Sequence, residues 1–172
     1  PYDGGQAVAS SLRMALRVQE VDGHPERRRL LLPVTINPEI LSLVRDYCKN
    51  VAEIGLVGYD VATGLMDLAD LERQLAGETA AAVFYENPSY LGFFETQTEE
   101  ISGLVHRAGA LVVVQPEVAS LGVVESPANY GADIVCGEIQ PLGMHIQYGG
   151  GCAGFIATRS EEKYIQQFPT YM

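Results

Sequence analysis

Short apolar runs alternate with amphipathic helical segments along this chain, and that alternation constrains the fold more than any other feature. The run from 110 to 114 is uniformly apolar, as is typical of a strand buried inside a parallel sheet. A helical pattern with Ile101, Leu104 and Val105 on one face precedes it and ends at Gly109. Strands that alternate with helices form a parallel sheet with right-handed crossovers. The sequence therefore predicts an α/β fold with a mostly parallel sheet and helices on both faces.

The other segments repeat this pattern. We expect further strands over 30–36, 53–60, 80–85, 134–136 and 153–157, and helices that begin near residues 6, 38, 68 and 98. Asp3, Asn37 and Asp67 are side chains that cap helix starts. A glycine-rich turn without a helix joins the last two strands, so we expect the last strand to run antiparallel to its neighbour.

The length of the chain suits one domain. We expect residues 1–172 to form a single α/β domain. The chain has no initiator methionine and stops soon after a helix has begun, so we interpret it as a fragment of a longer protein.

The charge and the cysteines limit the classes of partner and the compartment. A net charge of −11 argues against nucleic acid and against an anionic membrane surface, since both require clustered Lys and Arg. No apolar run is long enough to span a bilayer. Cys48, Cys136 and Cys152 are widely spaced and form no Cys-x-x-Cys pair, which indicates neither a disulfide framework nor a zinc site. We therefore expect a cytoplasmic protein without a metal, in which Cys48 and Cys136 are buried.

Candidate binding residues follow the carboxyl ends of the predicted strands, where open α/β sheets bind ligands. Asn87 and Tyr90 follow the strand at 80–85, Gln115 follows 110–114, and Gln140 follows 134–136.

Gly149 and Gly150 belong to a glycine run before the last strand. This run formally matches the dinucleotide-binding pattern G-x-G-x-x-G. That pattern requires a helix after it, whereas a strand is predicted here. We therefore interpret the run as a turn.

Several segments together carry a resemblance to one family. The most specific is Gly-Ala-Asp-Ile-Val-Cys-Gly-Glu-Ile-Gln-Pro-Leu-Gly at 131–143, and Asn-Pro-Ser-Tyr-Leu-Gly at 87–92 precedes it. Further matching segments lie at 2–4, 120–122, 148–150 and 154–157. In this order they resemble the alpha subunits (subunit 1) of glycine decarboxylase, the P-protein of the glycine cleavage system.

The resemblance implies the large domain of pyridoxal-phosphate enzymes of the aspartate-aminotransferase fold, without its small C-terminal domain. It implies a partner, the glycine decarboxylase beta subunit, which carries the cofactor lysine. The pair would decarboxylate glycine and pass the aminomethyl group to the lipoyl arm of the H-protein. Pyridoxal phosphate would then be attached to the beta subunit, with none on this chain alone.

The residues agree with a subunit that lacks catalytic groups. A Schiff base requires an amine nucleophile after the strand at 134–136, and Gln140 and Pro141 stand there instead. The cofactor's ring nitrogen requires an acidic partner, and Gln115 stands at the corresponding strand end. We therefore expect no catalytic, cofactor-binding or metal-binding residue on this chain. We expect Asn87, Tyr90, Gln115, Gln140, Gly149 and Gly150 to line a pseudo-active site or a subunit interface.

Two alternatives remain. The first is a self-sufficient pyridoxal-phosphate enzyme, such as a class V aminotransferase, which would have to use Lys49 or Lys163, the two lysines of the sequence. Lys49 is predicted to lie in a helix and Lys163 after the last strand, so neither is expected at the required turn. The second alternative is a pure scaffold.

Overall fold

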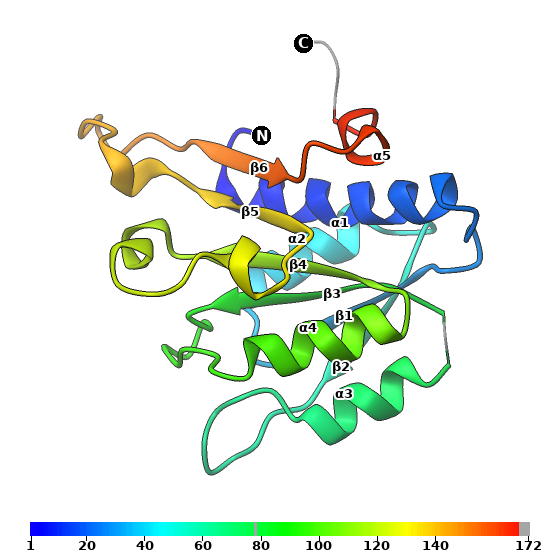
Figure 1. Cartoon of the computed structure of the whole chain (residues 1–172). Helices are drawn as coiled ribbons and strands as arrows, with labels where there is room; N and C mark the ends of the chain where they lie inside the picture. Colours follow the sequence, from blue (N-terminus) through cyan, green and yellow to red (C-terminus); the bar gives the residue numbers. More distant parts are fainter. Residues whose placement is uncertain (78, 169–172) are drawn as a thin grey trace.

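The computed structural model describes residues 1–77 and 79–168, and its centre is a six-stranded sheet with the order β2-β1-β3-β4-β5-β6 (Figure 1). The strands are β1 (Arg29–Pro33), β2 (Glu53–Val57), β3 (Ala80–Asn87), β4 (Leu111–Pro116), β5 (Ile134–Glu138) and β6 (Gly154–Thr158). Neighbouring strands from β2 to β5 pair in parallel, and β6 pairs antiparallel with β5. The predicted mostly parallel sheet and the antiparallel last strand are confirmed.

Helices cover both faces of the sheet (Figure 1). They are α1 (Gly4–Val21), α2 (Pro38–Tyr47), α3 (Leu68–Leu75), α4 (Thr98–Arg107) and α5 (Glu162–Ile165), with 3-10 turns η1 (Val118–Gly122), η2 (Pro127–Tyr130) and η3 (Gln140–Leu142). One core lies between the sheet and α1 with α2, and a second lies between the sheet and α3 with α4. Residues 82–85 of β3 and 111–114 of β4 alternate between these two cores, as the two-residue period of a strand requires.

The predicted caps set the starts of three helices. The Asp3 carboxylate accepts a hydrogen bond from the Gln6 N–H at 2.7 Å, and the Asn37 side chain accepts from the Glu39 N–H at 2.9 Å. Asp67 caps α3 by accepting from the N–H groups of Ala69 and Asp70. Because α1 and α2 both begin at the edge where the parallel strands end, these caps bring two helix N-termini to the same edge of the sheet.

Two strands are shorter than predicted. The strand expected over 30–36 ends at Pro33, because the chain turns there and the Ile36 N–H donates to the Pro33 carbonyl. The strand expected over 53–60 ends at Val57, because Tyr59 forms an isolated antiparallel bridge with Met66 instead of continuing along β1. In both cases a local turn replaces sheet pairing.

Candidate functional site

Three polar side chains stand in a row where the central strands end. Glu86 is the residue before the last one of β3, and Gln115 lies opposite it on β4. Glu138 is the last residue of β5. The residues two positions earlier on each strand belong to the core beneath α1, so all three side chains face α1 and α2. The row therefore lies where open α/β sheets bind ligands.

A cavity of about 390 Å³ opens beside this row. Its walls are the start of α1, the start of α2 and the ends of β4 and β5. Asp3, Glu39 and Glu138 contribute carboxylates to it, Gln115 contributes an amide, and no Lys, Arg or His is among its lining residues within the described parts of the chain. The cavity is therefore acidic.

The Glu138 carboxylate accepts hydrogen bonds from three segments of backbone. One oxygen accepts from the Gly4 N–H in α1 at 3.0 Å. The other accepts from the Gln140 N–H at 3.0 Å and from the Ala153 N–H, just before β6, at 2.5 Å. A single side chain thus joins the start of α1, the turn after β5 and the start of β6.

Glu86 is a second carboxylate at this edge, and it is buried. One of its oxygens accepts from the Asn37 N–H at 3.0 Å, at the start of α2. Burial raises the pKa of Glu86, because removal from water disfavours the ionised form, and hydrogen bonds from the N–H groups of Asn37 and Tyr90 oppose part of this shift.

The structure brings some of the predicted site residues together. Gln115 lines the acidic cavity beside Glu138, and its Oε1 has no hydrogen-bond partner within residues 1–77 and 79–168. Gln140 begins η3 and its backbone N–H binds Glu138. These two residues therefore belong to one edge of the sheet.

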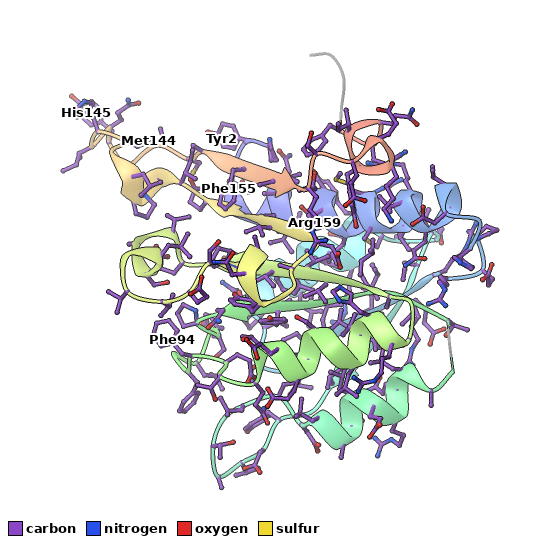
Figure 2. All side chains as sticks on the ribbon, viewed as in Figure 1. Tyr2, Phe94, Met144, His145, Phe155 and Arg159 are labelled. Carbon is purple, nitrogen blue, oxygen red and sulfur yellow. The ribbon has the colours of Figure 1, made fainter. Side chains whose placement is uncertain are left out.

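The other predicted site residues lie apart from that cavity. Asn87 is 7% exposed and its side-chain oxygen accepts from the Glu95 N–H at 3.2 Å, whereas Tyr90 is 58% exposed on the loop that follows. Gly149 and Gly150 have positive φ values in the exposed loop between β5 and β6. Figure 2 shows Met144 and His145 at the tip of the same loop, away from the sheet. The six predicted residues do not converge on one pocket.

Both lysines lie at the opposite edge of the sheet. Lys163 is in α5, and its Nζ donates to Asp22, the residue that caps the C-terminal end of α1, at 2.8 Å. Lys49 lies in the turn between α2 and β2, so its predicted placement in a helix is wrong, because α2 ends at Tyr47. Neither amine is at the carboxyl ends of the strands, where a Schiff-base lysine would be required.

Two of the three cysteines, Cys48 and Cys136, are buried. Burial raises the pKa of the Cys48 thiol to about 11 and that of Cys136 to about 12, while Cys152 is exposed. Within residues 1–77 and 79–168 no group of three or more His, Cys, Asp or Glu side chains is arranged to hold a metal ion. In the same residues, no helix has both the length and the apolar character needed to cross a membrane.

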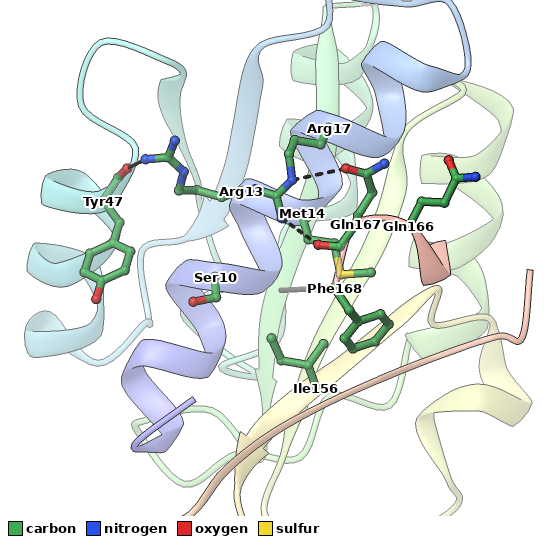
Figure 3. A pocket seen from close by; sticks show the side chains of 9 residues that line it. All are labelled: Ser10, Arg13, Met14, Arg17, Tyr47, Ile156, Gln166, Gln167 and Phe168. Atoms are coloured by element: carbon green, nitrogen blue, oxygen red, sulfur yellow. Dashed lines mark hydrogen bonds between the residues drawn. The ribbon is translucent and has the colours of Figure 1, made fainter. Parts of the chain in front are cut away.

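Another cavity, of about 610 Å³, lies along the outer side of α1 (Figure 3). Arg13 donates to the Tyr47 carbonyl at 2.8 Å, and Arg17 donates to the carbonyl and side-chain oxygens of Gln167. The residues that line it are arginines, neutral polar residues and apolar residues. Among residues 1–77 and 79–168, neither a lysine nor a carboxylate lines it, and its lining residues do not include those at the strand ends beside Glu138.

Glu86 and Glu138, whose carboxylates bind the starts of α2 and α1, were not predicted from the sequence. Both are separated by many residues from the N–H groups of Asn37 and Gly4 that they bind. One signal was available, since each is an acidic residue at the end of a predicted buried strand that is expected to face the starts of helices.

The fold is that of the pyridoxal-phosphate enzymes of the aminotransferase type. Solved structures support the fold. An alanine–glyoxylate aminotransferase from Nostoc sp. matches with a TM-score of 0.66 at 15% identity, covering 96% of this chain and 40% of that one. A glycine decarboxylase (P-protein) of the glycine cleavage system matches with a TM-score of 0.82 at 32% identity, covering 98% of this chain and 35% of that one.

The sequence comparisons define the family. The family described as glycine cleavage system P-protein matches residues 1–172, and the chain belongs to this family. A protein of Staphylothermus marinus named probable glycine dehydrogenase (decarboxylating) subunit 1 is 37% identical over 98% of this chain, and one of the same name from Geotalea daltonii is 38% identical over 98%. The chain spans 35–36% of the length of these relatives. The resemblance found in the sequence is thus confirmed.

The residues at the strand ends do not fit the cofactor that this fold family implies. Pyridoxal phosphate requires a lysine for its Schiff base and an acidic or basic partner for its ring nitrogen. The turn after β5 holds Gln140 and Pro141, and β4 presents Gln115. The N-terminus of α1, which would bind an anion, is already bonded to the carboxylates of Asp3 and Glu138. We therefore derive no chemical step through this cofactor on this chain.

Proposed function

We propose that this chain is the large-domain part of a glycine dehydrogenase (decarboxylating) subunit 1, without the small C-terminal domain, and that it lacks the lysine that binds the cofactor. In this proposal it acts with a homologous beta subunit. The pair decarboxylates glycine in the cytoplasm and transfers the aminomethyl group to the lipoyl arm of the H-protein. The names of the relatives and the glycine decarboxylase structure support this proposal.

The single observation that carries the proposal is the position of the lysines. Lys49 and Lys163 are the two lysines of the chain, and both lie at the edge of the sheet where the strands begin. Pyridoxal phosphate in the assembled enzyme would then be attached to the beta subunit. A self-sufficient pyridoxal-phosphate enzyme would require an amine at the opposite edge.

The role left for this chain is to shape a neighbouring site. The loops at the carboxyl edge expose large apolar side chains, which favour contact with another protein surface. They include Tyr90, Leu91, Phe94, Leu142 and Ile146. Figure 2 places Phe94 on the same side of the molecule as Met144 and His145. We propose that Asn87, Tyr90, Gln115, Gln140, Gly149 and Gly150 lie at or near this subunit interface.

The test is reconstitution of the full subunit that contains these residues with its beta subunit and lipoylated H-protein. Glycine-dependent exchange of labelled bicarbonate reports decarboxylation. We expect the double variant Lys49→Ala/Lys163→Ala to exchange label at the unmodified rate, because neither amine holds the cofactor. We expect Gln140→Ala to lower the rate several-fold. Loss of exchange in the double lysine variant, with the heteromer intact, would overturn the proposal.

A further inference from the structure

The N-terminus of α1 is a place where an anion is electrostatically favoured. The first backbone N–H groups of a helix have no partner within the helix, and the helix dipole adds a partial positive charge. In many proteins a phosphate fills such a position. In this chain the Gly4 N–H points at a carboxylate oxygen of Glu138 at 3.0 Å.

The environment of Glu138 resembles an anion site more than an ordinary helix cap. Its carboxylate also accepts hydrogen bonds from the Gln140 N–H, in the turn after β5, and from the Ala153 N–H, just before β6. Backbone N–H groups that converge from separate segments form a concavity that suits a carboxylate or a phosphate. In this protein the Glu138 carboxylate occupies the concavity.

While Glu138 is in place, an external anion at this helix start meets carboxylates, and the Gly4 N–H is already bonded. A Cβ atom built on Gly4 would lie 2.9 Å from the Cβ of Glu138, so the helix start and the end of β5 are already in close contact. The Asp3 carboxylate accepts from the Gln6 N–H, two residues further along the helix, at 2.7 Å. Glu39 adds a further negative charge to the same cavity.

We propose that Glu138 is an internal anion that occupies the phosphate position at the α1 N-terminus and thereby excludes phosphate-bearing ligands from this edge. Removal of its side chain would leave three convergent N–H groups that inorganic phosphate can bind. Glu138 thus determines which anions can bind at this edge of the sheet.

The test is chemical rescue of Glu138→Ala by inorganic phosphate in the full subunit. Loss of these hydrogen bonds to a charged group should lower Tm by on the order of 5 °C. We expect added phosphate to restore most of this loss in a saturable manner, compared with chloride at matched ionic strength. The unmodified protein and Glu39→Ala, which removes an exposed carboxylate from the same cavity, control for general salt effects and should gain little.

Each outcome decides the proposal. A rise in Tm with phosphate that is confined to Glu138→Ala supports it. A similar response in all the proteins, or none in Glu138→Ala, overturns it and leaves Glu138 as a structural link only. If Glu138→Ala is recovered unfolded in chloride, its refolding yield in phosphate becomes the readout. Recovery of folded protein supports the proposal, and its absence in both salts overturns it.

This inference depends on the geometry of the chain and not on the proposed activity. The rescue experiment uses no glycine, beta subunit or H-protein, whereas the exchange assay leaves Glu138 unchanged. Failure of one proposal is therefore distinguishable from failure of the other.

Discussion

At the scale of single residues, the buried Glu86 carboxylate gives this edge a dependence on pH. Its pKa is raised in the folded protein, chiefly by burial, above the value of about 4.3 that is usual for an exposed glutamate. The folded state therefore binds this proton more tightly than the unfolded state does. The contribution of Glu86 to stability is fully present below about pH 4.3 and is lost as the pH rises through the raised folded-state pKa.

Glu86→Gln should make this dependence visible. The amide is neutral at every pH, whereas Glu86 becomes a buried charge as the pH rises through its raised pKa. We expect the variant to be more stable, relative to the unmodified protein, at pH 8 than at pH 4, as measured by the free energy of unfolding. Urea unfolding at both pH values measures it, with the exposed Glu72→Gln as control. An equal difference at the two pH values would contradict this account of Glu86.

At the scale of elements, Asp133 connects α4 to the sheet. Its Oδ2 accepts from the Val112 N–H in β4 at 2.8 Å and lies 2.8 Å from the Nε2 of His106 in α4. Asp133 is buried, whereas the His106 side chain is 41% exposed. The link to β4 should therefore contribute more stability than the link to the histidine, which water screens.

We predict that Asp133→Ala lowers the unfolding free energy by about 1–3 kcal/mol, because the buried Val112 N–H would lose its partner. His106→Ala should cost less than about 1 kcal/mol. Chemical denaturation of both variants measures these changes. A larger loss in His106→Ala than in Asp133→Ala would show that the histidine, and not the strand N–H, is the important partner.

The elements themselves were largely predictable, because their signals are local. The apolar run at 110–114 and the caps Asp3, Asn37 and Asp67 are found in the structure as predicted. The predicted ends of the strands at 30–36 and 53–60 were wrong, because local turns replace sheet pairing there: the Ile36 N–H donates to the Pro33 carbonyl, and Tyr59 bridges to Met66.

At the scale of the whole molecule, the sequence indicated at which edge of the sheet the candidate site lies, but not the contacts within it. Parallel strands bring their carboxyl ends together, so residues after 80–85, 110–114 and 134–136 were expected near one another. The Glu138–Gly4 hydrogen bond joins residues 134 positions apart, and no local pattern contains that information. The Asp133–His106 pair was missed for the same reason, because it joins α4 to the residue before β5, 27 positions further along the chain.

The central claim is that this chain holds no cofactor lysine. The most direct measurement is incubation with pyridoxal phosphate, borohydride reduction and intact mass, on the unmodified chain and on Lys49→Ala and Lys163→Ala. The account predicts no saturable adduct, because both amines lie at the edge of the sheet opposite the strand ends. A stoichiometric adduct that disappears in one of the two lysine variants would contradict it and would require a self-sufficient enzyme.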